Sequence, residues 1–431
     1  MTSPNRGLNL PHPQMYSISC LKANRSIQVW NVKTLVVKPF STTMSSLHRR
    51  LHGIFNSTSV RATTQTNTVK ASARSARSQE GRLEKVVEKF KKSSASHRFR
   101  ASHGIYESTV RRLASAKQFS MIEEILEAQK KYPDISSEGF AIRLIALYGK
   151  AGMFDHAHKV FEEMPELNCP RTSKSFNALL AACVNAKKFD KVEELFRGLP
   201  QKVSIEVDLV SYNTVINAFC EMGSLDTGLL MLDELEKNGL EPDSVTFNTL
   251  LNGFYNNGRF SEGEKIWCMM ESKNVIPDIR SYNSRLRGMV HDSRISEAVN
   301  LIDEMQSKAI NPDVMSYNAL IKGFCNDGKL EEAKWWYREL RKNGCSPDWV
   351  TYVALIPRLC EEGDFDMAIE LCVEVINHQF IIDTAVIQRA VDVLVKKAKI
   401  EEAKELVELG NSRKHFQYRL KLPLDKLSLK L

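Results

Sequence analysis

Apolar residues from position 209 onward recur at helical spacing, in pairs of short segments separated by polar breaks. In the first segment they share one helix face: Tyr212, Val215, Ile216, Phe219 and Cys220. In the second segment they do the same: Leu225, Leu229, Leu232 and Leu235. Gly223 lies between the segments, where a left-handed glycine commonly ends a helix. The pattern predicts a hairpin of two helices.

This pattern returns with a constant period of 35 residues. The period is marked by asparagines that each follow an aromatic residue: Asn213, Asn248, Asn283 and Asn318. Pro-Asp pairs keep the same interval: Pro242-Asp243, Pro277-Asp278, Pro312-Asp313 and Pro347-Asp348. Proline there ends the second helix, because it lacks an N–H donor and clashes with the preceding turn. A fixed period of this length is typical of a solenoid, in which each unit buries its apolar face against its neighbours.

Two positions of the unit predict local structure. Numbering each unit from the residue after Pro-Asp puts the aromatic residue at position 4 and asparagine at position 5. Serine or threonine at position 3 is predicted to be the N-cap of the first helix. Position 20 holds only small residues, which allows the helix axes to approach closely: Gly228, Gly263, Ala298, Ala333 and Ala368.

These features resemble the pentatricopeptide repeat (PPR) family in its plain P-type form. The resemblance is carried by the segments SYNTVINAFCEMGSL, TFNTLLNGFYNNGRF, SYNSRLRGMVHDSRI and SYNALIKGFCNDGKL. The tetratricopeptide alternative has a period of about 34 residues with tryptophan at position 4 and glycine at position 8, which these segments lack. The resemblance implies an all-α fold, namely an α-solenoid wound as a right-handed superhelix of helix-turn-helix repeats of about 35 residues.

The resemblance is strongest over residues 173–383, and weaker units flank that segment on both sides. About nine units are predicted within 103–418, numbered here 1 to 9: 103–136, 137–172, 173–208, 209–243, 244–278, 279–313, 314–348, 349–383 and 384–418. A capping helix is predicted at 80–102, where Leu83, Val86, Val87 and Phe90 share one face. A basic C-terminal tail is predicted at 419–431.

Four units depart from the pattern at position 5 or at their end. Position 5 holds Glu107 in unit 1, is predicted to hold Ala141 in unit 2, and holds Val353 in unit 8. Unit 3 is one residue longer than the clear units and ends in Asp208 without a proline. Pro357 lies inside the first helix of unit 8 and is expected to kink it.

The N-terminal residues differ from the rest of the chain in charge. Residues 1–79 contain eleven Lys and Arg and no Asp or Glu, so that the formal charge of +8 leaves −3 for everything after them. Such a leader is typical of an organelle transit peptide, with an ordinary disordered basic tail as the alternative. The segment MSSLHRRLHGIF from Met44 is basic and amphipathic, which favours the mitochondrion over the chloroplast. Residues 1–43 lack that organisation, which leaves Met1 and Met44 as alternative starts.

The residues that usually carry chemistry are missing from the sequence pattern. The nine cysteines form no CxxC pair and no zinc-type spacing with histidine. Cys220, Cys325 and Cys360 share position 12, which predicts small buried side chains. No phosphate-binding glycine loop, nucleophile motif or deaminase motif is present. We therefore expect no enzymatic activity, metal, cofactor or small-molecule substrate, and no membrane span, because no run of about 18 apolar residues occurs.

The PPR resemblance implies that the unit reads one unpaired RNA base with position 5 and the residue at its end. The implied pairs, which in the family prefer uridine, are Asn177 with Asp208, Asn213 with Asp243, Asn248 with Asp278, Asn283 with Asp313, and Asn318 with Asp348. Position 2 sandwiches the base in this family, and here it holds Lys174, Val210, Val245, Arg280, Met315 and Val350. The alternative is that asparagine and aspartate only cap and brace neighbouring helices. An Asn amide matches uracil because it can accept from N3–H and donate to O4.

Two functions remain open. The first is a mitochondrial single-stranded RNA-binding protein that recognises a short U-rich site and acts in RNA stabilisation, processing or translation. The second is a PPR subunit bound to the small subunit of the mitochondrial ribosome, where it contacts proteins and rRNA. A five-base word recurs about once per thousand nucleotides, which is poor discrimination. Residues 80–410 carry a formal charge of about −8, which weakens phosphate attraction, whereas basic patches at 80–131 and 411–431 favour the second function slightly.

Overall fold

The computed structural model describes residues 68–377, 384–413 and 419–423, with side chains from residue 80 onward. The amphipathic segment at Met44, the unit end Asp383 and most of the predicted basic tail lie outside these residues. The described residues from Arg74 onward form one compact body. Within the described residues there are 20 α-helices, one short 3-10 helix and no strand, so the all-α prediction is confirmed.

Each predicted unit contains two helices, and the second starts 16 residues after the first in all nine units. The first helices are α4 His103–Ser115, α6 Glu138–Lys150, α8 Ser173–Asn185, α10 Leu209–Glu221, α12 Ser244–Asn256, α14 Ile279–His291, α16 Val314–Asn326, α18 Trp349–Glu362 and α20 Thr384–Lys396. The second helices are α5 Phe119–Glu127, α7 Phe154–Glu163, α9 Phe189–Val203, α11 Leu225–Lys237, α13 Phe260–Ser272, α15 Ile295–Ser307, α17 Leu330–Lys342, α19 Phe365–Asn377 and α21 Ile400–Ser412.

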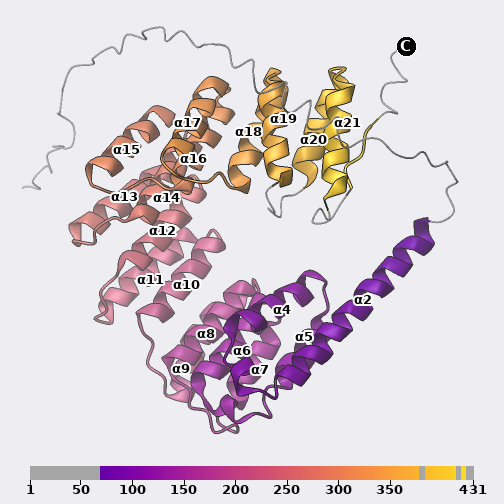
Figure 1. Ribbon diagram of the computed structural model, residues 1–431. Coiled ribbons are helices and arrows are strands. Elements are labelled where there is room, and N and C mark those ends of the chain that lie inside the picture. The colour runs from indigo at the N-terminus through magenta and orange to yellow at the C-terminus, as the bar shows by residue number, and fades with distance from the viewer. Residues whose placement is uncertain (1–67, 378–383, 414–418, 424–431) are drawn as a thin grey trace, which may run out of the picture. The chain divides into compact units, whose positions relative to one another are not determined.

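The hairpins stack in chain order. Each first helix from α6 to α18 contacts the second helix of its own unit and the first helix of the next, as the neighbouring ribbons of Figure 1 show for α10, α12, α14 and α16. Gly223, Gly258 and Gly328 have φ values between +72° and +76° at the turn between the two helices, as the sequence predicted. The predicted α-solenoid of helix-turn-helix repeats is therefore confirmed.

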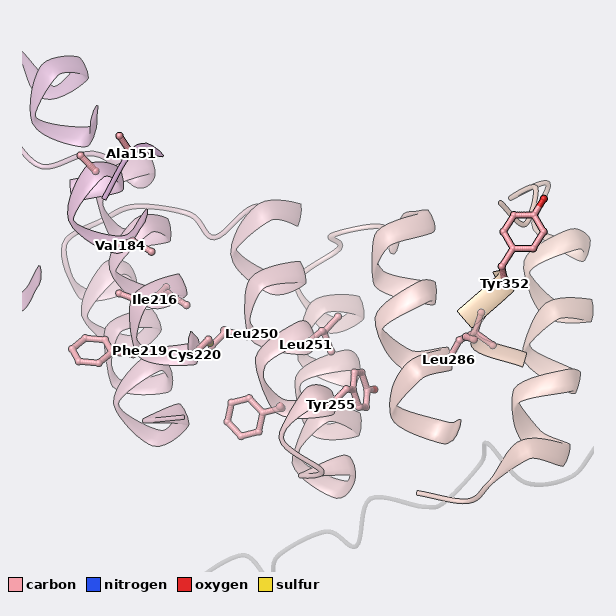
Figure 2. Packing of buried hydrophobic residues seen from close by; sticks show 14 of the residues in the cluster. Ala151, Val184, Ile216, Phe219, Cys220, Leu250, Leu251, Tyr255, Leu286 and Tyr352 are labelled. Carbon is pink, nitrogen blue, oxygen red and sulfur yellow. The ribbon is translucent and has the colours of Figure 1, made fainter. Parts of the chain in front are cut away.

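The core runs through the stack as one continuous cluster of buried side chains. The aromatic residues at position 4 are all at most 2% exposed: Tyr106, Phe176, Tyr212, Phe247, Tyr282, Tyr317 and Tyr352. Figure 2 shows how residues from successive first helices meet, with Cys220 of α10 beside Leu250 of α12. Cys220, Cys325 and Cys360 are buried, which confirms their predicted packing role.

Helix α2, Thr68–Ser93, covers the N-terminal end of the stack together with α3, His97–Arg100. It crosses the predicted boundary between the leader and the capping helix at residue 80, because the helix continues without a break into the leader. Phe90 packs edge-to-face on Phe99 and on Tyr106 of the first unit. These contacts shield the apolar surface that a terminal unit would otherwise expose.

The register of unit 2 differs by one residue from the sequence prediction. Helix α6 starts at Glu138, with Ser137 as its N-cap, so position 5 is Ile142 and not the predicted Ala141. Ala141 is instead fully buried at position 4. Two adjacent serines, Ser136 and Ser137, offered equivalent caps in the sequence, and only the packing of the helix face distinguishes them.

The irregular units keep the same phase. The extra residue of unit 3 is absorbed at the end of α9, which contains Pro200 and ends at the left-handed Ser204. Helix α18 continues through Pro357 to Glu362, and the kink predicted there stays a prediction. Searched over the described residues, the chain has no helix that is both long and apolar enough to cross a membrane.

Residues 419–423 return to the last unit and close its C-terminal end. The carboxamide of Gln388 accepts from the Lys421 backbone N–H at 2.8 Å and donates to the Lys421 carbonyl at 2.7 Å. Asn411 pairs in the same way with the backbone of Leu420, at 2.9 and 3.1 Å. The side chain of Leu420 is buried against Gly410, so both ends of the stack are covered by the chain itself.

The small residues at position 20 are buried, but their neighbours differ. A methyl group added at Gly263 would collide with the ring of Tyr255, which occupies position 12, where units 4, 7 and 8 have cysteine. A methyl group added at Gly228 would meet Leu250 Cδ2 at an ordinary 3.6 Å. The same substitution at the same position therefore has opposite expected effects.

We predict that Gly263→Ala lowers the free energy of unfolding by about 1–3 kcal/mol, because a packed ring must move. Gly228→Ala is the matched control, and its effect ranges from neutral to a gain of about 1 kcal/mol, because alanine is the better helix former. Thermal or urea unfolding of both variants measures the difference. Equal stability of the two variants would contradict the packing of Tyr255 against α13.

Candidate nucleic-acid interface

The structure brings together the two members of every pair that the sequence singled out. In each pair the asparagine Nδ2 donates to the aspartate Oδ1, and the five distances lie between 2.9 and 3.2 Å. The pairs are Asn177 with Asp208, Asn213 with Asp243, Asn248 with Asp278, Asn283 with Asp313, and Asn318 with Asp348. They form a continuous row from unit 3 to unit 7.

A third residue completes each pair. The hydroxyl at position 3 of the following unit donates to the asparagine Oδ1 at 2.6 Å in all five cases: Ser211, Thr246, Ser281, Ser316 and Thr351. The backbone N–H of the same residue donates to the aspartate Oδ1. We call this triad of asparagine, aspartate and position-3 hydroxyl the inter-unit bracket.

The bracket corrects one prediction about helix capping. The N-cap is the aspartate at the end of the preceding unit, and the position-3 residue is the reciprocal N3 member of a capping box. The predicted N-cap role of Ser211, Thr246 and their equivalents is therefore wrong. Two orphan N–H groups of each first helix are satisfied in this way, which stabilises the helix start by about 1 kcal/mol.

The bracket also fixes which way each asparagine amide points. A carboxylate accepts hydrogen bonds only, so the Nδ2 group faces the aspartate and the amide oxygen faces the hydroxyl. The amide oxygen thus already accepts one strong hydrogen bond. A base in contact with Asn248 therefore finds the second Nδ2 hydrogen as the readily available donor, and the Asp278 Oδ2, which has no hydrogen bond among the described residues, as an acceptor.

The carboxylate of Asp208 shows the electrostatic effect of the bracket. Burial raises its pKa, but hydrogen bonds from the Asn177 amide and the Ser211 backbone N–H outweigh that cost. The net result is a pKa for Asp208 below the ordinary value. The group therefore remains ionised and keeps its two functions, as a helix cap and as the acceptor for the neighbouring unit.

Apolar side chains lie exposed beside the row of pairs. Positions 2, 5, 9 and 13 share one face of a helix, which we call the position-5 face of the first helices. At position 2 of this face, Val210, Val245 and Met315 are 56%, 49% and 52% exposed. Lys174 and Arg280 are also exposed at this position, and Val350 is half-buried. A flat ligand that contacts the asparagine–aspartate pairs would therefore also contact the exposed apolar side chains at position 2.

The row of asparagine–aspartate pairs ends at unit 3 and unit 7 because different residues stand at the equivalent positions of units 2, 8 and 9. In unit 2, Glu138 replaces the bracket: its Oε1 accepts from the backbone N–H and the hydroxyl of Thr172, at 2.9 and 2.7 Å. In unit 8, position 5 is the apolar Val353. In unit 9, the position-5 residue is Gln388, whose amide is occupied by the tail. The sequence offered no pattern that singles out Glu138 or Gln388, because each acts once.

Comparison with known proteins identifies the repeats. The PPR repeat family matches residues 207–256, 242–291, 277–326 and 312–361, the PPR repeat matches 143–169, and the pentatricopeptide repeat domain matches 159–222. Together these matches cover residues 143–361, half of the chain.

Several proteins of Arabidopsis thaliana are similar to this chain. Small ribosomal subunit protein mS78 (rPPR3a) is 50% identical over 210 residues, which cover 46% of this chain and 53% of that protein. Small ribosomal subunit protein mS79 (rPPR3b) is 56% identical over 154 residues, which cover 36% of this chain and 39% of that protein. A mitochondrial pentatricopeptide repeat-containing protein is 44% identical over 134 residues, which cover 31% of this chain and 32% of that protein.

These matches span about half of each relative or less. Among solved structures, the pentatricopeptide repeat protein PPR10 from maize aligns with a TM-score of 0.44 and 20% sequence identity. That alignment covers 78% of this chain and 57% of PPR10.

Proposed function

The chain belongs to the pentatricopeptide repeat family, and on that premise we propose that it is an RNA-binding component of the small subunit of the mitochondrial ribosome. The observation that carries the proposal is the identity of 50% and 56% with two small ribosomal subunit proteins. Its mitochondrial location, predicted from the leader, is confirmed by the similarity to mitochondrial relatives.

Features of the solenoid support a scaffold role. Five inter-unit brackets tie units 3 to 8 into a fixed register, and both ends of the stack are closed by the chain itself. A stack braced in this way holds its binding surfaces in a constant geometry, which an assembly with structured RNA and proteins requires. Residues 80–410 carry a net negative charge. This charge favours contacts with both proteins and RNA over phosphate binding along the whole solenoid.

A second candidate function is favoured by the five contiguous pairs. Each pair keeps one Asn N–H, and in four of them an aspartate Oδ2, without a hydrogen bond among the described residues. A donor beside an acceptor fits a uracil edge, with N–H to O4 and carboxylate to N3–H. In this proposal Asn177, Asn213, Asn248, Asn283 and Asn318, with their aspartates, read five successive uridines of an unpaired RNA segment.

The ribosomal proposal predicts how the protein sediments in a mitochondrial extract. We expect it to co-migrate with the small ribosomal subunit, and to remain there after mild nuclease treatment that removes single-stranded RNA. An antibody against the endogenous protein, applied across a sucrose gradient, measures this. A free pool whose position shifts after nuclease would contradict the ribosomal proposal and support a factor bound to single-stranded transcripts.

The uridine proposal predicts the effect of Asn248→Thr on binding. Loss of the amide should weaken binding to oligouridylate by about 1–3 kcal/mol and reduce the discrimination against one purine at the matching base. The control is Ser281→Ala, which removes the hydrogen bond to Asn248 Oδ1 but leaves the amide in place. If both variants keep the uridine preference of the wild type, the pairs only brace the helices.

A further inference from the structure

The position-5 face changes its charge between units 5 and 6. In units 4 and 5, positions 2, 9 and 13 hold one charged residue among six: Val210, Asn217, Glu221, Val245, Asn252 and Asn256. In units 6 and 7 the same positions hold three cations and a histidine: Arg280, Arg287, His291, Met315, Lys322 and Asn326. The formal charge on these positions thus changes from −1 to +3 with histidine neutral, in a chain whose repeat region is acidic overall.

Side chains on this face touch across the unit boundary. Nη2 of Arg287 donates to Asn252 Oδ1, the same position in the preceding unit, at 2.7 Å, and to Ser284 Oγ at 3.1 Å. Asn252 Oδ1 also accepts from Asn256 Nδ2 at 3.1 Å. Position 9 therefore forms a contiguous surface beside the row of pairs, and Arg287 is held in place by neutral partners.

The three cations lack the carboxylate partners that neighbouring cations have. Among the described residues, Arg285, Arg294 and Lys308 are paired with glutamates of their own or an adjacent helix. In the same part of the chain, no ion pair is formed by Arg280, Arg287 or Lys322.

Arg287 is half-buried, and its burial lowers the pKa of the guanidinium, an effect that the charge of Asp313 only partly offsets. A charge that is partly desolvated and unpaired is costly unless a ligand supplies the counter-charge.

We propose that Arg280, Arg287 and Lys322 bind the phosphodiester backbone of the RNA segment that lies along units 6 and 7. The proposal rests on the RNA binding proposed above and assigns these backbone contacts to units 6 and 7. A guanidinium presents paired N–H donors that match phosphate oxygens, and an ammonium adds a point charge. The ligand is then anchored at units 6 and 7, while units 4 and 5 contribute little phosphate attraction.

The neighbouring groups favour RNA over an acidic peptide. Asn283 and Asn318 of the same face are only 3% and 6% exposed, so the apolar group that a ligand meets beside them is the side chain of Met315, which is 52% exposed at position 2. Bases offer a flat apolar face to such a side chain, whereas a glutamate-rich peptide does not.

The test is the salt dependence of binding of the full-length protein to a single-stranded ten-nucleotide oligouridylate. Each of Arg287→Gln and Lys322→Gln should reduce the slope of log K against log salt by about 0.7, and the double variant by about 1.4. The loss should be the same for oligouridylate and for a mixed sequence, because phosphate contacts carry no base information. Lys265→Gln on the exposed face of α13, where the lysine has no ion pair among the described residues, is the matched control and should keep the wild-type slope.

The outcomes separate this inference from the proposed function. Wild-type slopes in both variants, with RNA binding intact, would overturn the phosphate patch and leave RNA binding by the protein in place. Absence of any oligouridylate binding by the wild type would overturn the RNA-binding proposal and the patch with it. Displacement of bound oligouridylate by poly-glutamate at a lower concentration of charge than unlabelled oligouridylate requires would identify an acidic protein ligand and also overturn the patch.

Discussion

The inter-unit bracket is the interaction on which the remaining structure depends. One aspartate Oδ1 accepts from the amide of its own unit and from the backbone N–H at the start of the next helix, and the position-3 hydroxyl links back to the same amide. A helix cap and a contact between neighbouring units are thus made by one carboxylate. Since each bracket sets where the next first helix begins, five in succession keep units 3 to 8 in phase.

The same geometry explains which hydrogen-bonding groups the surface presents to a ligand and which units lack them. Because the bracket uses the amide oxygen and one amide hydrogen, it leaves a donor and an acceptor for a ligand, so bracing and base contact are compatible in one residue set. Where Glu138 takes over the bracket, or where the tail occupies Gln388, the surface loses that pair. The charge of the position-5 face adds a second asymmetry, because units 6 and 7 hold three cations at positions 2, 9 and 13 whereas units 4 and 5 hold none.

The repeat period was sufficient to predict the fold class and the helix pairs, and the resemblance to the PPR family implied the pairing of each asparagine with its aspartate. Periodicity could not predict contacts that occur once. The N-cap assignment to Ser211 and its equivalents failed because two candidates three residues apart, Asp208 and Ser211, both suit a helix start, and only the hydrogen bonds in the folded chain separate their roles. The register of unit 2 failed for a related reason, since Ser136 and Ser137 are interchangeable by composition.

The most direct test of the bracket is a double-mutant cycle on Asn283 and Ser316, whose 2.6 Å hydrogen bond is buried. The free energy of unfolding is measured by urea denaturation for the wild type, Asn283→Ala, Ser316→Ala and the double variant. We predict a coupling energy of about 0.5–1.5 kcal/mol, because Ser316→Ala leaves the buried Asn283 Oδ1 without its donor, whereas the double variant removes both partners. Additive effects, with a coupling energy below about 0.3 kcal/mol, would contradict the claim that this hydrogen bond holds neighbouring units in register.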